Sequence, residues 1–364
     1  MPVTAARYKR SATEPFETIL VERRELGPLD LRVDIAYAGI CHSDLHHAHN
    51  DRGTTTFPIV PGHEIAGTVS AVGSEVTRFA VGDTAGVGCT IDSCRECKNC
   101  RAGLQQYCEK GNILTYNARD YAGNITYGGY SKNIVVDEAY VTRIPAGMSL
   151  QSAAPMMCAG ITLYSPLRHW KAGPGKKVGI VGLGGLGHVG VQISAALGAE
   201  TVVFNLSTGA AEDAKRFGAH EYRDVNDPAS FSNGIGTFDL IISTVPANFD
   251  VNAYLNLLTV DGTFVNLGVP NDPLQIIPHS LLKFRRSISG SLSGGLGETQ
   301  EMIDFCAEHG VGAEVEIITA DAIDEAYERV ARGDVRFRFV IDVSTIGEPT
   351  SDSVLQLADS RIST

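Results

Sequence analysis

The pattern of hydrophobic and polar positions changes once along this chain, near Cys158. Before that point, apolar and polar residues alternate over short segments bounded by glycine or proline, which is the pattern of β-strands. The segments are Leu31–Ala38, Glu64–Val72, Val81–Gly88 and Lys132–Val136. Because the pattern places no helix between these strands, it predicts a small barrel-like domain rich in β-structure.

After Cys158, short apolar runs alternate with segments of helical period. The predicted strands are Lys177–Val181, Glu200–Phe204, Phe238–Ser243 and Thr263–Leu267, and the predicted helices are Gly187–Ala199 and Ala210–Phe217. Strands and helices that take turns imply a parallel sheet with crossover helices, so this part predicts a doubly wound α/β domain. A further helix, Glu298–Glu308, leads to mixed elements that end at Val340–Val343, and the polar residues from Gly347 onward predict a loose tail.

The composition narrows the classes of function. The chain has 364 residues, 43% of them hydrophobic, and a net charge of −12. An acidic chain is a poor partner for nucleic acid, whose binding depends on clustered Lys and Arg. No stretch approaches about 18 apolar residues, and the first residues lack the apolar run of a secretory signal, so we expect neither a membrane span nor secretion. These features predict a cytoplasmic protein whose partner is not a nucleic acid.

Half of the eight cysteines lie in one short segment, at Cys94, Cys97, Cys100 and Cys108. Steps of three, three and eight residues allow a loop to wrap a tetrahedral zinc ion, and intracellular clusters of this spacing usually bind metal. A disulfide is the alternative, but a Cys-x-x-Cys step makes a cramped bridge. Four thiolates leave no position for substrate, so the predicted role is structural.

A glycine-rich turn follows the first predicted strand after Cys158 and opens a helix. Its residues are Gly182, Leu183, Gly184, Gly185, Leu186 and Gly187, which fit G-x-G-x-x-G. In this context the pattern predicts a dinucleotide site: Gly182 makes the tight turn, Gly184 admits the pyrophosphate, and Gly187 allows close packing of helix on strand. A strand-to-helix turn without a ligand is the alternative.

The residues after the second predicted strand of this part bear on which dinucleotide binds. A carboxylate there would hold the ribose 2′-hydroxyl of NAD, but the segment Asn205–Gly209 contains none, and the first one is Glu212. Ser207 and Thr208 can donate to a 2′-phosphate, which favours NADP. NAD stays possible because the first cation is Lys215, and the two hydroxyl residues could instead cap the following helix.

A second metal site is suggested by Cys41, His63 and Cys158, with Glu64 as a displaceable fourth ligand. Two thiolates and an imidazole with one exchangeable position form a typical catalytic zinc site. Taken alone, His63 and Glu64 could belong to a surface turn, and Cys158 could be an ordinary buried cysteine.

Three further histidines are assigned simpler roles. His47 and His49 are predicted to be solvated side chains, since only a fixed geometry makes a metal ligand. His188 follows the glycine-rich turn and is predicted to pack or to cap.

These motifs together resemble the zinc-dependent medium-chain alcohol dehydrogenases, most closely their cinnamyl alcohol dehydrogenase-like branch. The matching segments are Gly39–His46, Val60–Glu64, the four-cysteine segment, Thr115–Asn117, Gly128–Ser131, Met157–Arg168 and Val181–His188. The resemblance runs from Ala5 to Val343. It implies a GroES-like catalytic domain at 1–158, a Rossmann domain at 159–296, and a return of 297–364 to the catalytic domain.

The resemblance also implies roles for single residues. Cys41, His63, Glu64 and Cys158 become the ligands of a catalytic zinc, and Asp44 becomes the carboxylate that orients His63. Ser43 takes the alcohol proton and passes it through the cofactor ribose to His46. The implied cofactor contacts outside the glycine-rich turn are His42, Thr162, Thr244, Gly268, Ser291, Leu292 and Ser293. The last Rossmann strand, which carries the final three, also pairs across the axis of a homodimer in this family.

The resemblance therefore implies an enzyme with two zinc ions per chain that transfers hydride between NADP(H) and an aldehyde or primary alcohol. The alternatives are an NAD-dependent dehydrogenase or a specialised natural-product reductase on the same zinc site, and a non-catalytic cofactor-binding relative. Ala210 and Ala211 stand where this branch usually has Lys, which weakens the NADP preference. Leu114 stands where members that prefer aromatic substrates carry a bulky ring, so the substrate class stays open.

Overall fold

The computed structural model describes residues 1–206, 208–270, 272–349 and 354–357. The chain forms two compact units, each described by itself below. Unit 1 comprises Met1–Cys158, Gly295–Ala307 and Gly312–Thr364, and unit 2 comprises Ala159–Gly294 and Glu308–Val311. None of the described helices is both long and apolar enough to cross a lipid bilayer.

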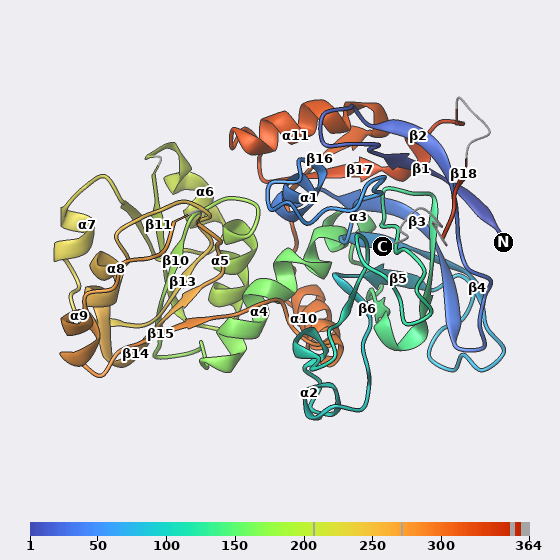
Figure 1. Ribbon diagram of the computed structural model, residues 1–364. Helices are drawn as coiled ribbons and strands as arrows, with labels where there is room; N and C mark the ends of the chain where they lie inside the picture. The colour runs from blue at the N-terminus through green and yellow to red at the C-terminus, as the bar shows by residue number, and fades with distance from the viewer. Residues whose placement is uncertain (207, 271, 350–353, 358–364) are drawn as a thin grey trace. The chain divides into compact units, whose positions relative to one another are not determined.

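Unit 1 is built on a mixed sheet that joins distant parts of the chain (Figure 1). Its order is β16-β17-β3-β4-β5-β9, with β8 also paired to β3. The bounds are β16 Val315–Thr319, β17 Arg338–Asp342, β3 Asp30–Gly39, β4 Ile65–Val72, β5 Thr84–Val87, β9 Thr142–Arg143 and β8 Asn133–Asp137. The register sets Val340 opposite Gly39 and Ala38 opposite Ile65. The carboxyl end of β3 is thereby held between the start of β4 and β17, which comes from the other end of the sequence.

Two smaller sheets complete the strands of unit 1. One contains β1 (Val3–Tyr8), β2 (Glu17–Glu22) and β18 (Val354–Leu355), and the other pairs β6 (Thr90–Asp92) with β7 (Ile113–Leu114). The predicted loose tail is wrong for 354–357, because β18 pairs with β2 and the Leu357 side chain is 7% exposed within the core. The Ile125 amide donates to the Leu357 carbonyl at 2.8 Å.

Helices also occur in the part of unit 1 for which only strands were predicted. They are α1 His42–Ala48, α2 Lys98–Arg101 and α3 Leu150–Ala153, and the returning segment adds α10 Leu296–Glu308 and α11 Ile323–Ala331. The expectation of no helix before Cys158 was wrong because these helices are too short to show a period. In α1, for example, only Leu45 and Ala48 form the buried apolar face, while Asp44 lies in the first turn, where a carboxylate is favoured.

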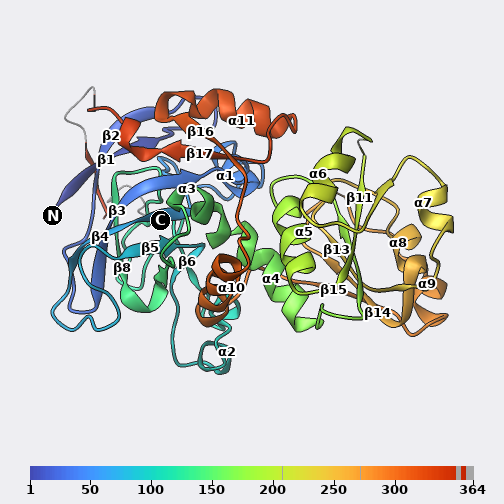
Figure 2. The ribbon, with the colours of Figure 1, turned by 180° about the vertical axis from the view of Figure 1, so that it is seen from behind.

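Unit 2 confirms the predicted doubly wound domain. Its parallel sheet has the order β12-β11-β10-β13-β14-β15. The strands are β12 Glu221–Asp224, β11 Glu200–Asn205, β10 Lys177–Val181, β13 Phe238–Ser243, β14 Leu258–Asn266 and β15 Ser287–Gly290, and the helices are α4 Ala159–His169, α5 Gly187–Ala196, α6 Ala211–Arg216, α7 Ala229–Ser232, α8 Val251–Leu257 and α9 Pro278–Leu282. Figures 1 and 2 show α5 and α8 on opposite sides of the strands.

The boundaries in unit 2 follow from local chemistry. Strands β10 and β13 have the predicted bounds, because buried parallel strands read as continuous apolar runs. Helix α5 ends three residues earlier than predicted, before Gly198, whose φ of 85° stops the helix. Since the strands are parallel, their carboxyl ends share one edge of the sheet, where ligands bind in this architecture.

Candidate functional site

Two clusters in unit 1 bring four metal-ligating side chains together. One contains Cys94, Cys97, Cys100 and Cys108, the other contains Cys41, His63, Glu64 and Cys158, and within each cluster the donor atoms lie within 4.8 Å of one another. Zn–S bonds of about 2.3 Å in a tetrahedron require sulfur atoms about 3.8 Å apart. Cys94 Sγ and Cys100 Sγ are 3.8 Å apart, so the four-cysteine cluster fits zinc.

Amide groups of the same loop point at three of the four sulfur atoms. The amide of Cys94 donates to Cys108 Sγ, that of Cys97 to Cys94 Sγ, and that of Cys100 to Cys97 Sγ, each at 3.4 Å. The fourth sulfur, Cys100 Sγ, lies 3.2 Å from Ser93 Oγ. Such donors stabilise thiolates, so the loop is built for a metal and not for disulfides.

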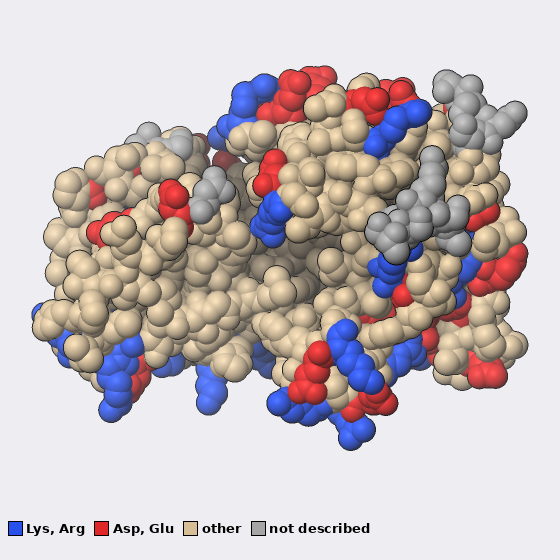
Figure 3. Space-filling view, in the orientation of Figure 1, with Lys and Arg blue, Asp and Glu red and all other residues tan. Residues whose placement is uncertain are grey.

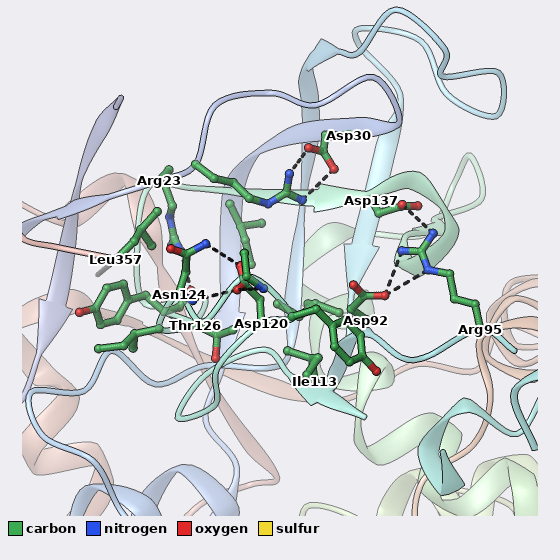
Figure 4. Close-up of a pocket in the computed structure, with 17 residues that line it drawn as sticks. Arg23, Asp30, Asp92, Arg95, Ile113, Asp120, Asn124, Thr126, Asp137 and Leu357 are labelled. Atoms are coloured by element: carbon green, nitrogen blue, oxygen red, sulfur yellow. Dashed lines mark hydrogen bonds and ion pairs between the residues drawn. The ribbon is translucent and has the colours of Figure 1, made fainter. Parts of the chain in front are cut away.

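Arg95 attaches this zinc lobe to the rest of unit 1 (Figure 4). It has a left-handed φ of 62°, and its guanidinium contacts Asp92 at 3.0 Å and Asp137 at 2.9 Å. Its guanidinium carbon lies 5.1 Å from the centre of the Tyr140 ring. Figure 3 shows charges of both signs mixed on the lobe around α2, where Lys98 pairs with Glu109 at 3.3 Å. These contacts fix the lobe without a large apolar core.

A cavity of about 370 Å³ lies beside Arg95 in unit 1, lined in part by Ile91, Ile113 and Leu357 (Figure 4). Several of its charged groups pair with one another, as Arg24 does with both carboxylate oxygens of Asp30. It contains none of the predicted site residues.

The second cluster is assembled from three separate segments. Cys41 lies between β3 and α1, His63 and Glu64 directly precede β4, and Cys158 follows the 3₁₀ turn Ala154–Met157. All four are 9% exposed or less. The hydrogen bond from Cys158 is the main cause that holds the pKa of Cys41 well below its usual value. A deprotonated thiol beside an imidazole favours zinc binding.

Asp44 supports this cluster from α1 and is fully buried. Its Oδ1 accepts from the Gly62 amide at 3.1 Å and lies 3.1 Å from His63 Nδ1, and its Oδ2 accepts from the Cys41 amide at 2.9 Å. The predicted partner of His63 therefore lies in place. A Cβ on Gly62, whose φ is 106°, would lie 2.7 Å from the Tyr130 ring, so only glycine brings the amide this close.

Glu64 faces a buried cation that the sequence analysis missed. Arg338 Nη2 in β17 lies 2.9 Å from Glu64 Oε1, although the two atoms are not aligned for a hydrogen bond. A Cβ on Gly39 would lie 2.1 Å from Glu64 Oε2, so glycine at the end of β3 makes room for the carboxylate. Burial raises the pKa of Glu64 to about 8, against the opposing charge of Arg338.

Cys89 is a third thiol near this cluster, and sequence reasoning assigned it no role. The hydrogen bond from Cys158 is the main cause that lowers the pKa of Cys89 to about 7. Two signals could have drawn attention to these residues. Arg338 is a lone charge in an apolar strand, and Cys89 is one of only two cysteines outside the two predicted zinc sites.

Helix α1 also presents the residues assigned to proton transfer. His42 and Ser43 are exposed in its first turn, and His46 Nδ1 lies 2.7 Å from Asp51 Oδ2. His47, predicted to be solvated, is instead half-buried: its Nδ1 lies 3.0 Å from Asn117 Nδ2. His49 is exposed, as predicted.

The glycine-rich turn of unit 2 joins β10 to α5. Gly182 has a φ of 92°, and a Cβ on Gly187 would lie 1.9 Å from the Gly182 carbonyl oxygen, so the turn and the close packing require these glycines. A Cβ on Gly184 would meet nothing within 4 Å. No protein atom therefore requires glycine at position 184. A glycine there fits a site where the phosphates of a ligand approach the backbone closely. His188 is buried and its Nδ1 lies 3.1 Å from the Gly184 carbonyl, as expected for a packing residue.

Among the other predicted cofactor contacts, Thr244, Gly268 and the segment 291–293 follow strands of this sheet, whereas Thr162 lies on α4 and His42 on α1 of unit 1. Thr244 follows β13 and its amide donates to the Val181 carbonyl at 3.0 Å, and Gly268 follows β14. The segment 291–293 lies just after β15 and not within it as predicted, because the strand ends at Gly290. Ser207 lies outside the described residues, and Thr208 begins a short 3₁₀ turn, Thr208–Ala210.

Comparisons with known proteins agree with this architecture. Residues 27–146 match the alcohol dehydrogenase GroES-like domain, and residues 185–308 match the zinc-binding dehydrogenase family. NADP-dependent alcohol dehydrogenase C 1 of Mycolicibacterium smegmatis is 55% identical over 95% of this chain and 99% of its own length. Aldehyde reductase YahK of Escherichia coli is 49% identical over 92% of this chain and 97% of its own.

A solved structure shows the same fold. The cinnamyl alcohol dehydrogenase of Sorghum bicolor superposes with a TM-score of 0.91 at 37% identity, covering 97% of this chain and all of that one. The resemblance drawn from the motifs is thereby confirmed. The chain belongs to the zinc-dependent medium-chain alcohol dehydrogenase family, in its cinnamyl alcohol dehydrogenase-like branch.

Proposed function

We propose that this protein is an NADP(H)-dependent zinc alcohol dehydrogenase that interconverts aldehydes and primary alcohols. The convergence of Cys41, His63 and Cys158 in a buried cluster is the observation that carries the proposal. Two relatives carry the names NADP-dependent alcohol dehydrogenase and aldehyde reductase, which supports this activity. Unit 1 would be the catalytic domain and unit 2 the Rossmann domain. The predicted bounds, 1–158 with 297–364 and 159–296, differ from these units at 295–296 and at 308–311.

The residues of this cluster would have different roles in binding zinc. Cys41, Cys158 and His63 would be permanent ligands, while Glu64 can leave, because Arg338 receives its charge at 2.9 Å. Bound zinc supplies Lewis-acid polarisation of the substrate oxygen. Asp44 holds His63 in the tautomer that presents Nε2 to the metal.

Proton transfer is assigned to α1. Ser43 would accept the proton of the alcohol hydroxyl while its own proton passes to the cofactor ribose, and His46, three residues further along α1, would exchange a proton between the ribose and solvent. His46 Nδ1 lies 2.7 Å from Asp51 Oδ2, a contact that holds the imidazole ring in one orientation.

The preference for NADP(H) rests on unit 2. No carboxylate occurs from Asn205 to Ala211, so nothing in that segment repels a 2′-phosphate. Ser207, Thr208 and the glycine-rich turn would bind the nucleotide. Because Ala210 and Ala211 provide no cation there, NAD is the second candidate cofactor.

We also propose a cytoplasmic homodimer. Strand β15 is an edge of the six-stranded sheet, and unpaired edges invite pairing with a second copy. Exposed apolar residues occur nearby in the sequence, with Ile277, Leu282 and Leu292 at 59%, 76% and 65% exposure. Figure 3 shows a largely uncharged surface over α8, bordered by Lys and Arg side chains near α9 and β14. Eight unpaired cysteines suit a reducing compartment.

Initial rates decide between these functions. NADPH and NADH should be compared against aliphatic, aromatic and branched aldehydes, with metal content measured on the same preparation. We expect two zinc ions per chain and higher kcat/KM with NADPH. Higher kcat/KM with NADH would replace the cofactor assignment, and a folded, zinc-loaded protein inactive across the panel would favour a non-catalytic cofactor-binding relative. Light scattering at the mass of one chain would exclude the dimer.

A further inference from the structure

The segment Thr115–Asn117 matched the family pattern, but no role was assigned to it above. The structure places it against the candidate catalytic zinc site. The Thr115 amide donates to the Cys89 carbonyl at 3.1 Å, so the segment runs alongside the connection from β5 to β6. The next residue, Tyr116, is 5% exposed. A tyrosine buried this far usually has a partner for its hydroxyl.

Tyr116 contacts both members of the Asp44–His63 pair. Its ring centre lies 5.8 Å from that of His63, and the two planes are tilted by only 32°. Burial raises the pKa of Tyr116 well above its usual value, and the charge of Asp44 together with a hydrogen bond from the hydroxyl to this carboxylate adds to the rise. Because Asp44 also accepts from the amides of Cys41 and Gly62, its two carboxylate oxygens are surrounded by donors.

The ring of Tyr116 is itself held from its other side. His47 meets it edge-on, with ring centres 5.3 Å apart. Asn117, at a left-handed φ of 54°, contacts His47 Nδ1 through its Nδ2 at 3.0 Å and accepts from the Thr56 amide at 2.9 Å. Tyr116 therefore lies between two histidine rings, each fixed by a hydrogen bond of its own.

We propose that Tyr116 is a positioning residue of the catalytic zinc site, whose hydroxyl fixes the Asp44 carboxylate and whose ring fixes the His63 imidazole. Groups that orient a metal-bound imidazole commonly change metal affinity by about 10- to 100-fold when they are removed. The proposal rests on the zinc assignment made above, and it requires nothing of the reaction catalysed there.

Tyr327 of α11 provides a matched control. It is 2% exposed, and its hydroxyl bonds to that of Tyr130 at 3.2 Å. Its ring packs edge-on against Phe16 with centres 5.2 Å apart. Tyr327→Phe therefore removes a buried hydroxyl from the same aromatic region without removing a donor to Asp44.

The experiment measures release of zinc from the holoenzyme to a chromogenic chelator. Cobalt substitution assigns the two release phases, since a four-sulfur site and a mixed sulfur–nitrogen site absorb differently. We expect Tyr116→Phe to speed release from the mixed site by about 10-fold, with the four-cysteine phase unchanged. Tyr327→Phe should leave both phases within about twofold of the wild type.

Three outcomes would overturn the proposal: unchanged release in Tyr116→Phe, equal acceleration by Tyr327→Phe, or acceleration of both phases, which indicates general loosening. A double-mutant cycle with Asp44→Asn adds a second test. If the hydroxyl acts through Asp44, its removal has little further effect in the Asp44→Asn background. These measurements do not depend on turnover, so an inactive wild type would contradict the proposed function alone.

Discussion

The two four-donor clusters of unit 1 differ in where their donors come from. The cysteines from Cys94 to Cys108 belong to one loop whose own amides point at the sulfur atoms. The donors from Cys41 to Cys158 come from three segments, which the central sheet brings together. The first cluster can therefore organise its loop around a metal, whereas the second depends on a fold that forms independently of it.

Their surroundings differ in the same way. The loop cluster lies on a charged surface lobe, held by contacts such as that of Arg95 with Asp137. The sheet cluster is enclosed by buried groups of both signs, Asp44, Glu64 and Arg338. Charges buried at such cost are typical of catalytic sites. The comparison predicts that damage to one cluster costs stability and damage to the other costs activity.

The largest effect is expected from Cys41→Ser. A hydroxyl is a much poorer zinc ligand than a thiolate, so we expect kcat to fall by about 1,000-fold or more. Binding of NADPH, measured by fluorescence titration, should change by less than about threefold, because the glycine-rich turn belongs to unit 2. Near-normal turnover would show that the sheet cluster is not the catalytic metal site.

Cys97→Ser tests the other half of the comparison. We expect one zinc ion per chain in place of two and a Tm lower by about 10 °C, because a structural metal contributes its binding energy to folding. Calorimetry and elemental analysis measure the two quantities. Cys306→Ala, which removes a buried cysteine outside both clusters, is the control and should retain both zinc ions. An unchanged Tm in Cys97→Ser would contradict a structural metal.

The same difference decided how much the sequence could reveal. The loop cluster was predicted from spacing alone, because its ligands are local. In unit 2, β10 and β13 were predicted to the residue, because each is a buried strand with a continuous apolar run. Cys41 and Cys158 could be joined only through the family resemblance, since no spacing rule links residues so far apart.

What the sequence did not reveal is mostly tertiary. Arg338 is found opposite Glu64 only because β17 pairs with β3 across nearly the whole chain. Helix α1 was missed because seven residues carry too little periodicity, and tertiary contacts of Leu45 and Ala48 stabilise it. His47 was predicted to be solvated because its contacts with Tyr116 and Asn117, which are distant in sequence, cannot be inferred from the residues next to it.

Arg338→Met tests how much the buried ion pair beside the sheet cluster contributes to the stability of the fold. Above pH 8, where Glu64 is ionised beside Arg338, the variant removes the cation that stabilises this buried carboxylate, which should lower the free energy of unfolding by about 3 kcal/mol. Urea unfolding measures this. Adding Glu64→Gln should restore part of the loss, because the uncompensated charge is then gone. If the single variant is as stable as the wild type, the ion pair does not stabilise the fold.

Of these variants, Ser93→Ala should have the smallest effect on stability. It tests whether a single hydrogen bond of the loop helps to hold zinc in the four-cysteine cluster. Ser93 Oγ lies 3.2 Å from Cys100 Sγ and 2.7 Å from Tyr140 Oη, and the residue is 2% exposed. Ser93→Ala removes one hydrogen bond to a thiolate. We therefore expect the free energy of unfolding to fall by about 1 kcal/mol and zinc to leave the four-cysteine site a few-fold faster.

Tyr140→Phe separates the two hydrogen bonds of Ser93. If Tyr140 only orients the serine hydroxyl, its change should have a smaller effect than Ser93→Ala in the same release assay, and release from the sheet cluster should not change in either variant. Acceleration at both clusters would mean that the lobe is coupled to the sheet through Tyr140. The distinction between a self-organised metal loop and a metal site imposed by the fold would then fail, since one hydroxyl would serve both.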